Sequence, residues 1–355
     1  MHPRSLPSSH VRMVRARTPG KPWAEEVHAR CRVARRVCSV NPWFAGARRR
    51  TIGTMRTTKT RPRLIRVALA ACVSLLTLLS VLASPALGDD GEEDRARPNA
   101  FYLSLGDSMG FGLQFDRLFA MLDAGTYTPD AFNTGYTDVF AARMQRHRPD
   151  QQTVNMSCPG ESTDTMINGG CFFTLPEPEG AGLTLHTSYS GSQLDAAVSF
   201  LRSHRHRVGP VTVSIGGIDA ADVIGETCNF DAACISRSGL RDSLGRGLDR
   251  ILGAIHTAAP DTEIILVVFY NPFSISNPGT DGLWRHNYAS PERDAARRNG
   301  ARVADASEIV NGARVCQLTF LCASGDSHPN DAGYRRIGDQ IFHVAFHRHL
   351  DGDDD

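Results

Sequence analysis

Five short, mostly apolar runs separated by helical patterns constrain the fold of this chain more than any other feature. The expected strands are 100–105, 153–156, 211–215, 264–269 and 302–304. Three of them are almost uninterrupted by polar residues, which is typical of strands buried on both faces of a parallel sheet. The alternation of such strands with helices predicts an α/β protein, with one three-layer α/β/α domain over residues 98–350.

Apolar residues at helical spacing fill the gaps between these strands and follow the last one. The clearest stripes are Leu194, Val198 and Leu201; Leu240, Leu244, Leu248, Ile251 and Ile255; and Ile337, Ile341, Val344 and Ala345. Each stripe predicts a helix that buries one face against the sheet.

Charge divides the chain into two unlike parts. Residues 1–66 contain 17 Lys and Arg but only 2 Asp and Glu, although the whole chain has a formal net charge of +1. Residues 1–54 are rich in Arg and show no sustained apolar period, so we expect a disordered basic leader and a translation start at Met55. The alternative is a long basic pre-region or a nucleic-acid-binding arm.

An export signal is expected over residues 55–88. Basic residues precede the apolar stretch 67–82, and small residues with Pro85 follow it. This order is typical of a secretory signal peptide, with cleavage near Ala86 and a secreted, extracellular product. The rival interpretation is an uncleaved membrane anchor, because 67–87 is about long enough to span a bilayer. Residues 89–97 read as an acidic linker and 351–355 as an acidic tail.

The cysteines of the predicted mature chain agree with export. Their even number favours disulfides in an oxidising compartment. Their grouping along the sequence favours three local pairs, Cys158 with Cys171, Cys228 with Cys234, and Cys316 with Cys322. A zinc site is the rival, but His partners at ligand spacing are missing, so no metal is expected.

Four polar segments follow the predicted strands or precede the last helix. They are Gly106-Asp107-Ser108, 155–162 with Gly160, 215–219, and Asp326-Ser327-His328-Pro329-Asn330. Sites in open α/β sheets lie at the carboxyl ends of strands, so these segments are expected to meet along one rim.

The order of these four segments resembles that of the SGNH (GDSL-type) hydrolase family, in particular its secreted bacterial esterase or lipase-like members, over nearly all of residues 98–346. The resemblance implies a mainly parallel, flavodoxin-like five-stranded sheet. It also implies a nucleophile at Ser108, a general base at His328 and an acidic residue that orients the imidazole. We assign the last role to Asp326, two residues before His328; Asp331 is the alternative, although Asn330-Asp331 more simply caps the last helix.

The resemblance also implies an oxyanion hole made from the backbone N–H groups of Ser108 and Gly160 and an Asn side chain. At the Asn position this chain has Ile218, which cannot donate a hydrogen bond. Losing one such donor typically costs about 10²–10³ in turnover. A slower enzyme, a substitute donor such as Asn155 or Asn229, and a catalytically silent binding protein all remain open.

The expected function is therefore a secreted serine hydrolase of carboxylic esters that forms an acyl-enzyme on Ser108, with no cofactor. The expected partner is a small-molecule or lipid ester, not a nucleic acid, and no stable membrane span is expected after signal cleavage. Phe111, Phe115, Leu118, Phe119 and Phe132 could form an apolar wall for an acyl chain, as could Phe172 and Phe173. Stacking by Trp284, Tyr270 and Tyr288 would instead suit an acetylated sugar, so a carbohydrate or cell-wall deacetylase stays open.

Overall fold

The computed structural model describes residues 99–346. The basic leader, the signal peptide, the acidic linker and the acidic tail expected from the sequence lie outside these residues. Between residues 99 and 346, no helix combines the length and the apolar character that crossing a bilayer requires.

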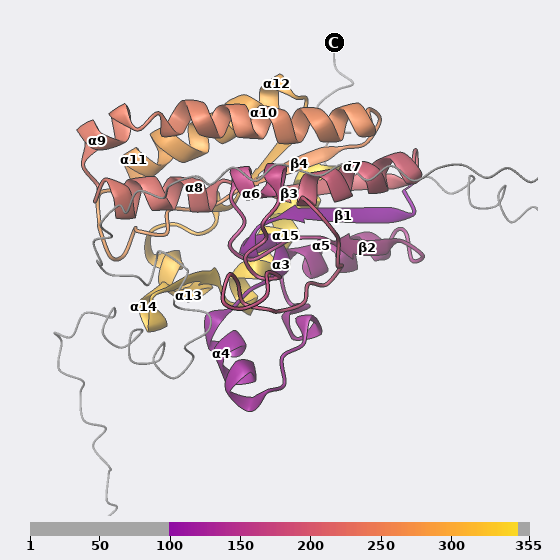
Figure 1. Ribbon diagram of the computed structural model, residues 1–355, viewed down its shortest axis with the longest axis horizontal. Coiled ribbons are helices and arrows are strands. Elements are labelled where there is room, and N and C mark those ends of the chain that lie inside the picture. Colours follow the sequence, from indigo (N-terminus) through magenta and orange to yellow (C-terminus); the bar gives the residue numbers. More distant parts are fainter. Residues whose placement is uncertain (1–98, 347–355) are drawn as a thin grey trace, which may run out of the picture.

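A parallel sheet of five strands forms the centre of the described chain (Figure 1). The strands are β1 (Phe101–Gly106), β2 (Gln152–Asn155), β3 (Val208–Ser214), β4 (Ile264–Val268) and β5 (Arg302–Asp305), in the order β2-β1-β3-β4-β5. This is the flavodoxin-like arrangement expected from the sequence, so the predicted fold class is confirmed. Only β3 differs from its expected bounds by more than one residue. It begins three residues early, at Val208. Gly209 and Pro210, which disfavour strands, lie where the pairing register between β1 and β3 shifts, and such irregularities tolerate both residues.

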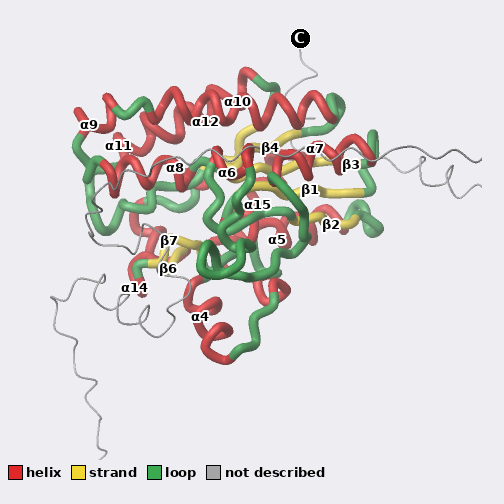
Figure 2. Tube along the Cα trace, in the orientation of Figure 1, coloured by secondary structure: helices red, strands yellow, loops and turns green. Residues whose placement is uncertain are grey.

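Alternate residues of the strands enter two different cores, because successive side chains point to opposite faces of a sheet. Leu103, Val211 and Leu266 pack with one set of helices, whereas Tyr102 and Ile265 pack with the other. The first face is covered by α6 (Thr163–Asn168), α7 (Gln193–Ser203), α10 (Leu240–Ala258) and α12 (Ser290–Arg298). The second is covered by α5 (Tyr136–Gln145) and α15 (Asp331–Phe346). Figure 2 shows these helices around the strands.

The apolar stripes read from the sequence are the buried faces of these helices. Leu194 and Leu201 are buried on α7, and all five residues of the 240–255 stripe are buried on α10. On α15, Ile337 and Ile341 are buried, and Val344 and Ala345 pack against the same core. The three predicted helices are confirmed.

Shorter elements surround the carboxyl ends of the strands. They are α3 (Ser108–Phe111), α4 (Phe115–Ala124), η2 (Pro129–Phe132), α8 (Gly217–Ala221), η3 (Asp222–Thr227), α9 (Ala232–Arg237), α11 (Asp281–Trp284), η4 (Arg285–Ala289), η5 (Ala306–Glu308), η6 (Gly312–Arg314), α13 (Val315–Leu318), β6 (Thr319–Phe320), α14 (Leu321–Ser324) and β7 (Asp326–Pro329). β6 and β7 form a separate antiparallel pair. A third apolar cluster joins α4 to the segment around Cys171. The four polar segments found in the sequence meet at one rim, because Ser108, Gly160, Ile218 and His328, one from each segment, line the same cavity.

Candidate active site

Ser108 lies at the turn where β1 passes into α3. Gly106 ends the strand with φ +122°, and a Cβ atom there would lie 1.8 Å from the carbonyl oxygen of Ser214 on β3, so only glycine fits. The buried carboxylate of Asp107 then accepts hydrogen bonds from Met109 N (3.0 Å) and from the Ser214 hydroxyl (3.1 Å). These contacts fix the first turn of α3, which begins with Ser108.

A chain of hydrogen bonds joins Ser108 to His328 and Asp326. His328 Nε2 lies 2.8 Å from Ser108 Oγ, and His328 Nδ1 lies 2.5 Å from Asp326 Oδ1. The Asp326 carboxylate also accepts from His328 N (3.0 Å) and, through its second oxygen, from Phe115 N (2.9 Å). Every Asp326 oxygen is therefore partnered although the side chain is buried.

Asp326 stands two residues before His328 on β7, and alternate side chains of a strand lie on the same face, so the carboxylate and the imidazole lie side by side. The hydroxyl of Tyr270 donates to the carbonyl of Ser327 between them. Asp331 has other partners: it accepts from Gln114 Nε2 (2.9 Å) and pairs with Arg117 (3.5 Å). Of the two acidic residues weighed from the sequence, the structure brings Asp326 to the imidazole.

A cavity of about 420 Å³ opens beside Ser108 and His328, and most of its lining is apolar. Its walls include Phe115, Leu118 and Phe119 from α4, Phe172 and Phe173, and Ile218, Phe269, Phe273, Ile275 and Leu321. Both aromatic walls expected from the sequence thus contribute. Two members of the first wall were assigned wrongly: Phe111 and Phe132 are fully buried and pack against each other, with ring centroids 5.4 Å apart.

The expectation of a sugar-stacking surface was also wrong. Trp284, Tyr270 and Tyr288 are only 3%, 1% and 1% exposed. Their polar atoms are used inside the protein. Trp284 Nε1 donates to the Phe269 carbonyl (3.2 Å), and the Tyr288 hydroxyl accepts from Phe269 N (3.0 Å). Trp284 and Tyr288 belong to the core on one face of the sheet and Tyr270 to the core on the other, so none of the three rings offers a face to a ligand.

The oxyanion side of the site contains both predicted backbone positions. Ser108 and Gly160 line the cavity, and Gly160 has φ +83°, a left-handed conformation that favours glycine. Ile218, on α8, lines the same cavity and presents no donor from its side chain.

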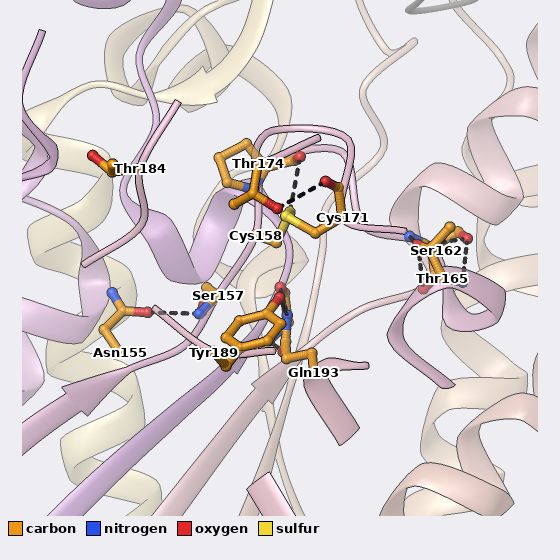
Figure 3. The surroundings of a disulfide bond; sticks show 12 residues. Asn155, Ser157, Cys158, Ser162, Thr165, Cys171, Thr174, Thr184, Tyr189 and Gln193 are labelled. Carbon is orange, nitrogen blue, oxygen red and sulfur yellow. Dashed lines mark hydrogen bonds between the residues drawn. A yellow bond between two sulfur atoms is a disulfide. The ribbon is translucent and has the colours of Figure 1, made fainter. Parts of the chain in front are cut away.

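Neither Asn155 nor Asn229, the substitute donors proposed from the sequence, reaches the part of the cavity around Ser108, Gly160 and Ile218. The Asn155 amide donates to the Gly110 carbonyl (2.9 Å), and its oxygen accepts from Ser157 N (3.0 Å), as Figure 3 shows for the second contact. Asn155 and Asn229 are both absent from the cavity lining. The hypothesis that one of them replaces the missing side chain was wrong.

Buried acidic groups next to the site were not recognised in the sequence. Burial raises the pKa of Asp107 to about 6, against the opposing effect of its hydrogen bonds, and raises the pKa of Glu161 to about 8. Glu292, on α12, is fully buried, and neither of its carboxylate oxygens has a hydrogen-bond partner within residues 99–346. Burial, followed by the charges of Asp219 and Asp107, raises the pKa of Glu292 well above its ordinary value.

The structure contains the three disulfides expected from the sequence, Cys158–Cys171, Cys228–Cys234 and Cys316–Cys322. The first, shown in Figure 3, joins the loop before Gly160 to the segment that carries Phe172. Its sulfurs lie close to the Glu161 carboxylate, in a group that could otherwise hold a metal ion. Because both sulfurs are used in the bond, no thiolate ligand remains there.

Comparison with known proteins gives a family match and several structural likenesses. The model of the GDSL-like lipase/acylhydrolase family matches residues 104–336. No curated protein sequence matches the chain. Among solved structures, an extracellular lipase from Streptomyces rimosus is similar with 19% identity and a TM-score of 0.44, over 67% of this chain and 97% of that one. An acetylxylan esterase from Geobacillus stearothermophilus is similar with 13% identity and a TM-score of 0.45, over 70% of this chain and 95% of that one.

The family match covers well over half of the chain and includes both the Gly106-Asp107-Ser108 turn and the Asp326–His328 segment. This protein therefore belongs to the GDSL-like lipase/acylhydrolase family and is a carboxylic ester hydrolase of the SGNH/GDSL type.

Proposed function

We propose that this protein hydrolyses esters of apolar acyl chains through a covalent acyl-enzyme on Ser108. The observation that carries the proposal is the continuous set of hydrogen bonds from Ser108 Oγ through His328 to Asp326, at the floor of a largely apolar cavity. A serine hydroxyl attacks poorly until a base removes its proton, and the base needs a fixed tautomer. Asp326 fixes it by accepting a hydrogen bond from the Nδ1–H group of His328.

In the first step, the Ser108 hydroxyl proton passes to His328 Nε2 while Oγ bonds to the ester carbonyl carbon. The carbonyl π electrons move onto oxygen, and the backbone N–H groups of Ser108 and Gly160 stabilise the oxyanion. The intermediate collapses when the carbon–alkoxide bond breaks, and the leaving alcohol takes the proton from Nε2. Water then repeats the sequence on the acyl-enzyme and releases the carboxylic acid.

The lining of the cavity supports an apolar acyl group as the preferred substrate portion. Phe115, Leu118 and Phe119 lie on one side of Ser108, with Phe172 and Phe173 also in the wall. Burying an acyl methylene contributes about 0.8 kcal/mol, so each added carbon that fits should improve kcat/KM severalfold. The named sugar-stacking residues are buried, which removes the sequence-based reason for a carbohydrate substrate.

We also propose that the enzyme acts outside the cell. Its three disulfides support this, because such bonds persist in oxidising compartments. The predicted signal peptide is consistent with the same destination.

Hydrolysis of p-nitrophenyl esters from acetate to palmitate, together with labelling by a fluorophosphonate probe, tests the proposal. Wild-type protein should react with the probe at a single site and prefer a longer acyl chain to acetate. Ser108→Ala should lose both hydrolysis and labelling. Absence of labelling in the folded wild type would contradict the proposed nucleophile, and a preference for acetate would contradict the proposed acyl specificity.

A further inference from the structure

One buried side chain binds both peptide groups of the residue at which the nucleophile turn begins. Gly106 N donates to Gln193 Oε1 (2.6 Å), and Gln193 Nε2 donates to the Gly106 carbonyl oxygen (3.0 Å). Gln193 lies 87 residues further along the chain, at the first position of α7, and is 1% exposed. Its amide thus completes the hydrogen bonding of β1 at the strand end next to the site.

The same glycine also connects the two backbone segments that would form the oxyanion hole. The Gly106 carbonyl accepts a second hydrogen bond from Cys158 N (2.8 Å). Ser108 lies two residues after Gly106, and Gly160 lies two residues after Cys158. The two short stretches leaving this junction therefore carry the two backbone donors, and the Gln193 amide holds the junction from the side opposite β3.

The surroundings of Gln193 fix its amide without bringing it to the substrate. Nε2 lies 3.4 Å from the Tyr189 hydroxyl, and Figure 3 shows both side chains near the Cys158–Cys171 disulfide. Ser192 caps α7 through Asp195 N, which sets the start of the helix. Gln193 does not line the cavity beside Ser108.

We infer that Gln193 is a positioning residue that holds the Ser108 turn and the Gly160 loop at the separation required for oxyanion binding. The inference rests on the proposed roles of Ser108 and Gly160. Oxyanion donors act only when they are held where the charge develops, so a small displacement lowers kcat more than it changes binding of the ground state. A side chain without the amide would take away the partner of Gly106 N and would leave the Gly106 carbonyl with only the hydrogen bond from Cys158 N.

Gln193→Met tests this with Gln151→Met as a matched control. Gln151 is also a buried glutamine, 4% exposed, and its Nε2 binds the carbonyls of Asn99 and Gly209 (2.9 Å each) at the opposite ends of the strands. Both variants should lower Tm. Only Gln193→Met should lower kcat for p-nitrophenyl butyrate about 10- to 100-fold and slow fluorophosphonate labelling, with KM within about threefold of wild type.

Gln193→Glu gives a second readout and preserves the side-chain volume. A protonated glutamic acid can accept from Gly106 N and donate to the Gly106 carbonyl, whereas the carboxylate can only accept. The kcat ratio of this variant to wild type should therefore fall as pH rises. The buried acids near this position, Asp107 and Glu161, titrate in both proteins, so the ratio isolates residue 193.

A kcat for Gln193→Met within threefold of that for Gln151→Met would overturn the inference, and so would a pH-independent ratio for Gln193→Glu. If Gln193→Met does not fold, the pH dependence of the kcat ratio of Gln193→Glu to wild type tests the inference by itself. An inactive, unlabelled wild type would instead refute the proposed function, which separates the two failures.

Discussion

The two sides of Ser108 differ in how well their polar groups are satisfied. On the side of β7, His328 and Asp326 are joined to each other, to Ser108 and to the backbone by four hydrogen bonds. On the side of α8, Ile218 occupies the place where the family resemblance implies an asparagine. The carboxyl group of Glu292, which finds no hydrogen-bond partner in the described part of the chain, lies next to Gly216.

This difference bears on which of two steps, proton transfer by His328 or stabilisation of the oxyanion, is the better supported by the surrounding groups. The proposed base, His328, needs little rearrangement to take and return a proton, because its hydrogen bonds to Ser108 and Asp326 are already formed. The proposed oxyanion donors on the opposite side are the backbone N–H groups of Ser108 and Gly160. The acids Glu292, Asp107 and Asp219 lie close to the start of α8, at Gly216 and Gly217. Negative charge on these acids would oppose an oxyanion, and burial reduces that charge by raising the pKa of all three. We therefore expect oxyanion stabilisation, rather than proton transfer, to limit the rate.

The largest expected effect comes from removing the carboxylate that binds His328. Asp326→Asn should lower kcat by about 10³- to 10⁴-fold, because an amide can donate to Nδ1 and so favour the tautomer that cannot accept the serine proton. Steady-state kinetics on a p-nitrophenyl ester measures the loss. Asp331→Asn is the control, since Asp331 binds Gln114 instead of His328, and it should retain kcat within a few-fold. Equal losses in the two variants would show that Asp326 has no special role.

Adding a side-chain donor at residue 218 should improve the proposed oxyanion hole and so raise the rate. Ile218→Asn is expected to raise kcat by about 10-fold or more, because one donor in an oxyanion hole contributes up to about 10²–10³ in turnover. Ile218→Leu keeps the apolar character and should change kcat little. An unchanged or lower kcat in a folded Ile218→Asn protein would mean that backbone donors already suffice at this site.

The raised pKa of Glu292 should make the free energy of unfolding depend on pH. The pKa of Glu292 is higher in the folded than in the unfolded protein, so the folded state holds its proton more tightly and the free energy of unfolding falls as pH rises above the unfolded pKa. Each pH unit costs at most about 1.4 kcal/mol until the folded pKa is reached. Glu292→Gln removes this contribution.

Urea unfolding at pH 5, 7 and 9 measures the effect. Glu292→Gln should become more stable relative to wild type as pH rises, whereas Glu179→Gln, at an exposed position, should not. A difference between Glu292→Gln and wild type that is independent of pH would contradict the assigned titration.

The smallest expected effect concerns the loop that carries Gly160. Removing the Cys158–Cys171 disulfide by a double alanine substitution should raise KM for longer esters severalfold, because the bond ties this loop to the segment with Phe172. Pro159 and Phe172, the chain neighbours of the first pair, line the cavity, whereas no chain neighbour of Cys228 or Cys234 does. Removing Cys228–Cys234 should therefore lower Tm with little change in KM. Thermal unfolding and a chain-length series separate the two variants. The same KM change in both would show that the first bond has no specific link to substrate binding.

The local patterns in the sequence determined the sheet, the main helices, the disulfide pairs and the order of the site segments. Strand and helix periods depend on near neighbours along the chain, and each disulfide joins cysteines at most 13 residues apart. The rule that sites lie at the carboxyl ends of parallel strands then predicted that Ser108, Gly160 and His328 would meet.

Tertiary packing alone decided which apolar rings face the cavity. Phe115 and Phe119 line it while Phe111 and Phe132 fill the core, and Trp284 and Tyr288 are enclosed beneath β4. Nothing in a local pattern distinguishes these rings, because each is an aromatic residue in a connection between two strands of the sheet. Their exposure depends on what packs over them from distant parts of the chain.

The same reason explains the polar groups that were missed. Gln193 meets Gly106 across 87 residues, and Glu292 reaches Gly216 from α12 on another part of the chain. A glutamine or glutamate at a helix start is usually solvated, so its type gives no sign of burial. The sequence therefore determined the scaffold and the segments that carry the chemistry. Long-range packing decided which side chains hold those segments in place, because it alone sets which groups lose contact with water.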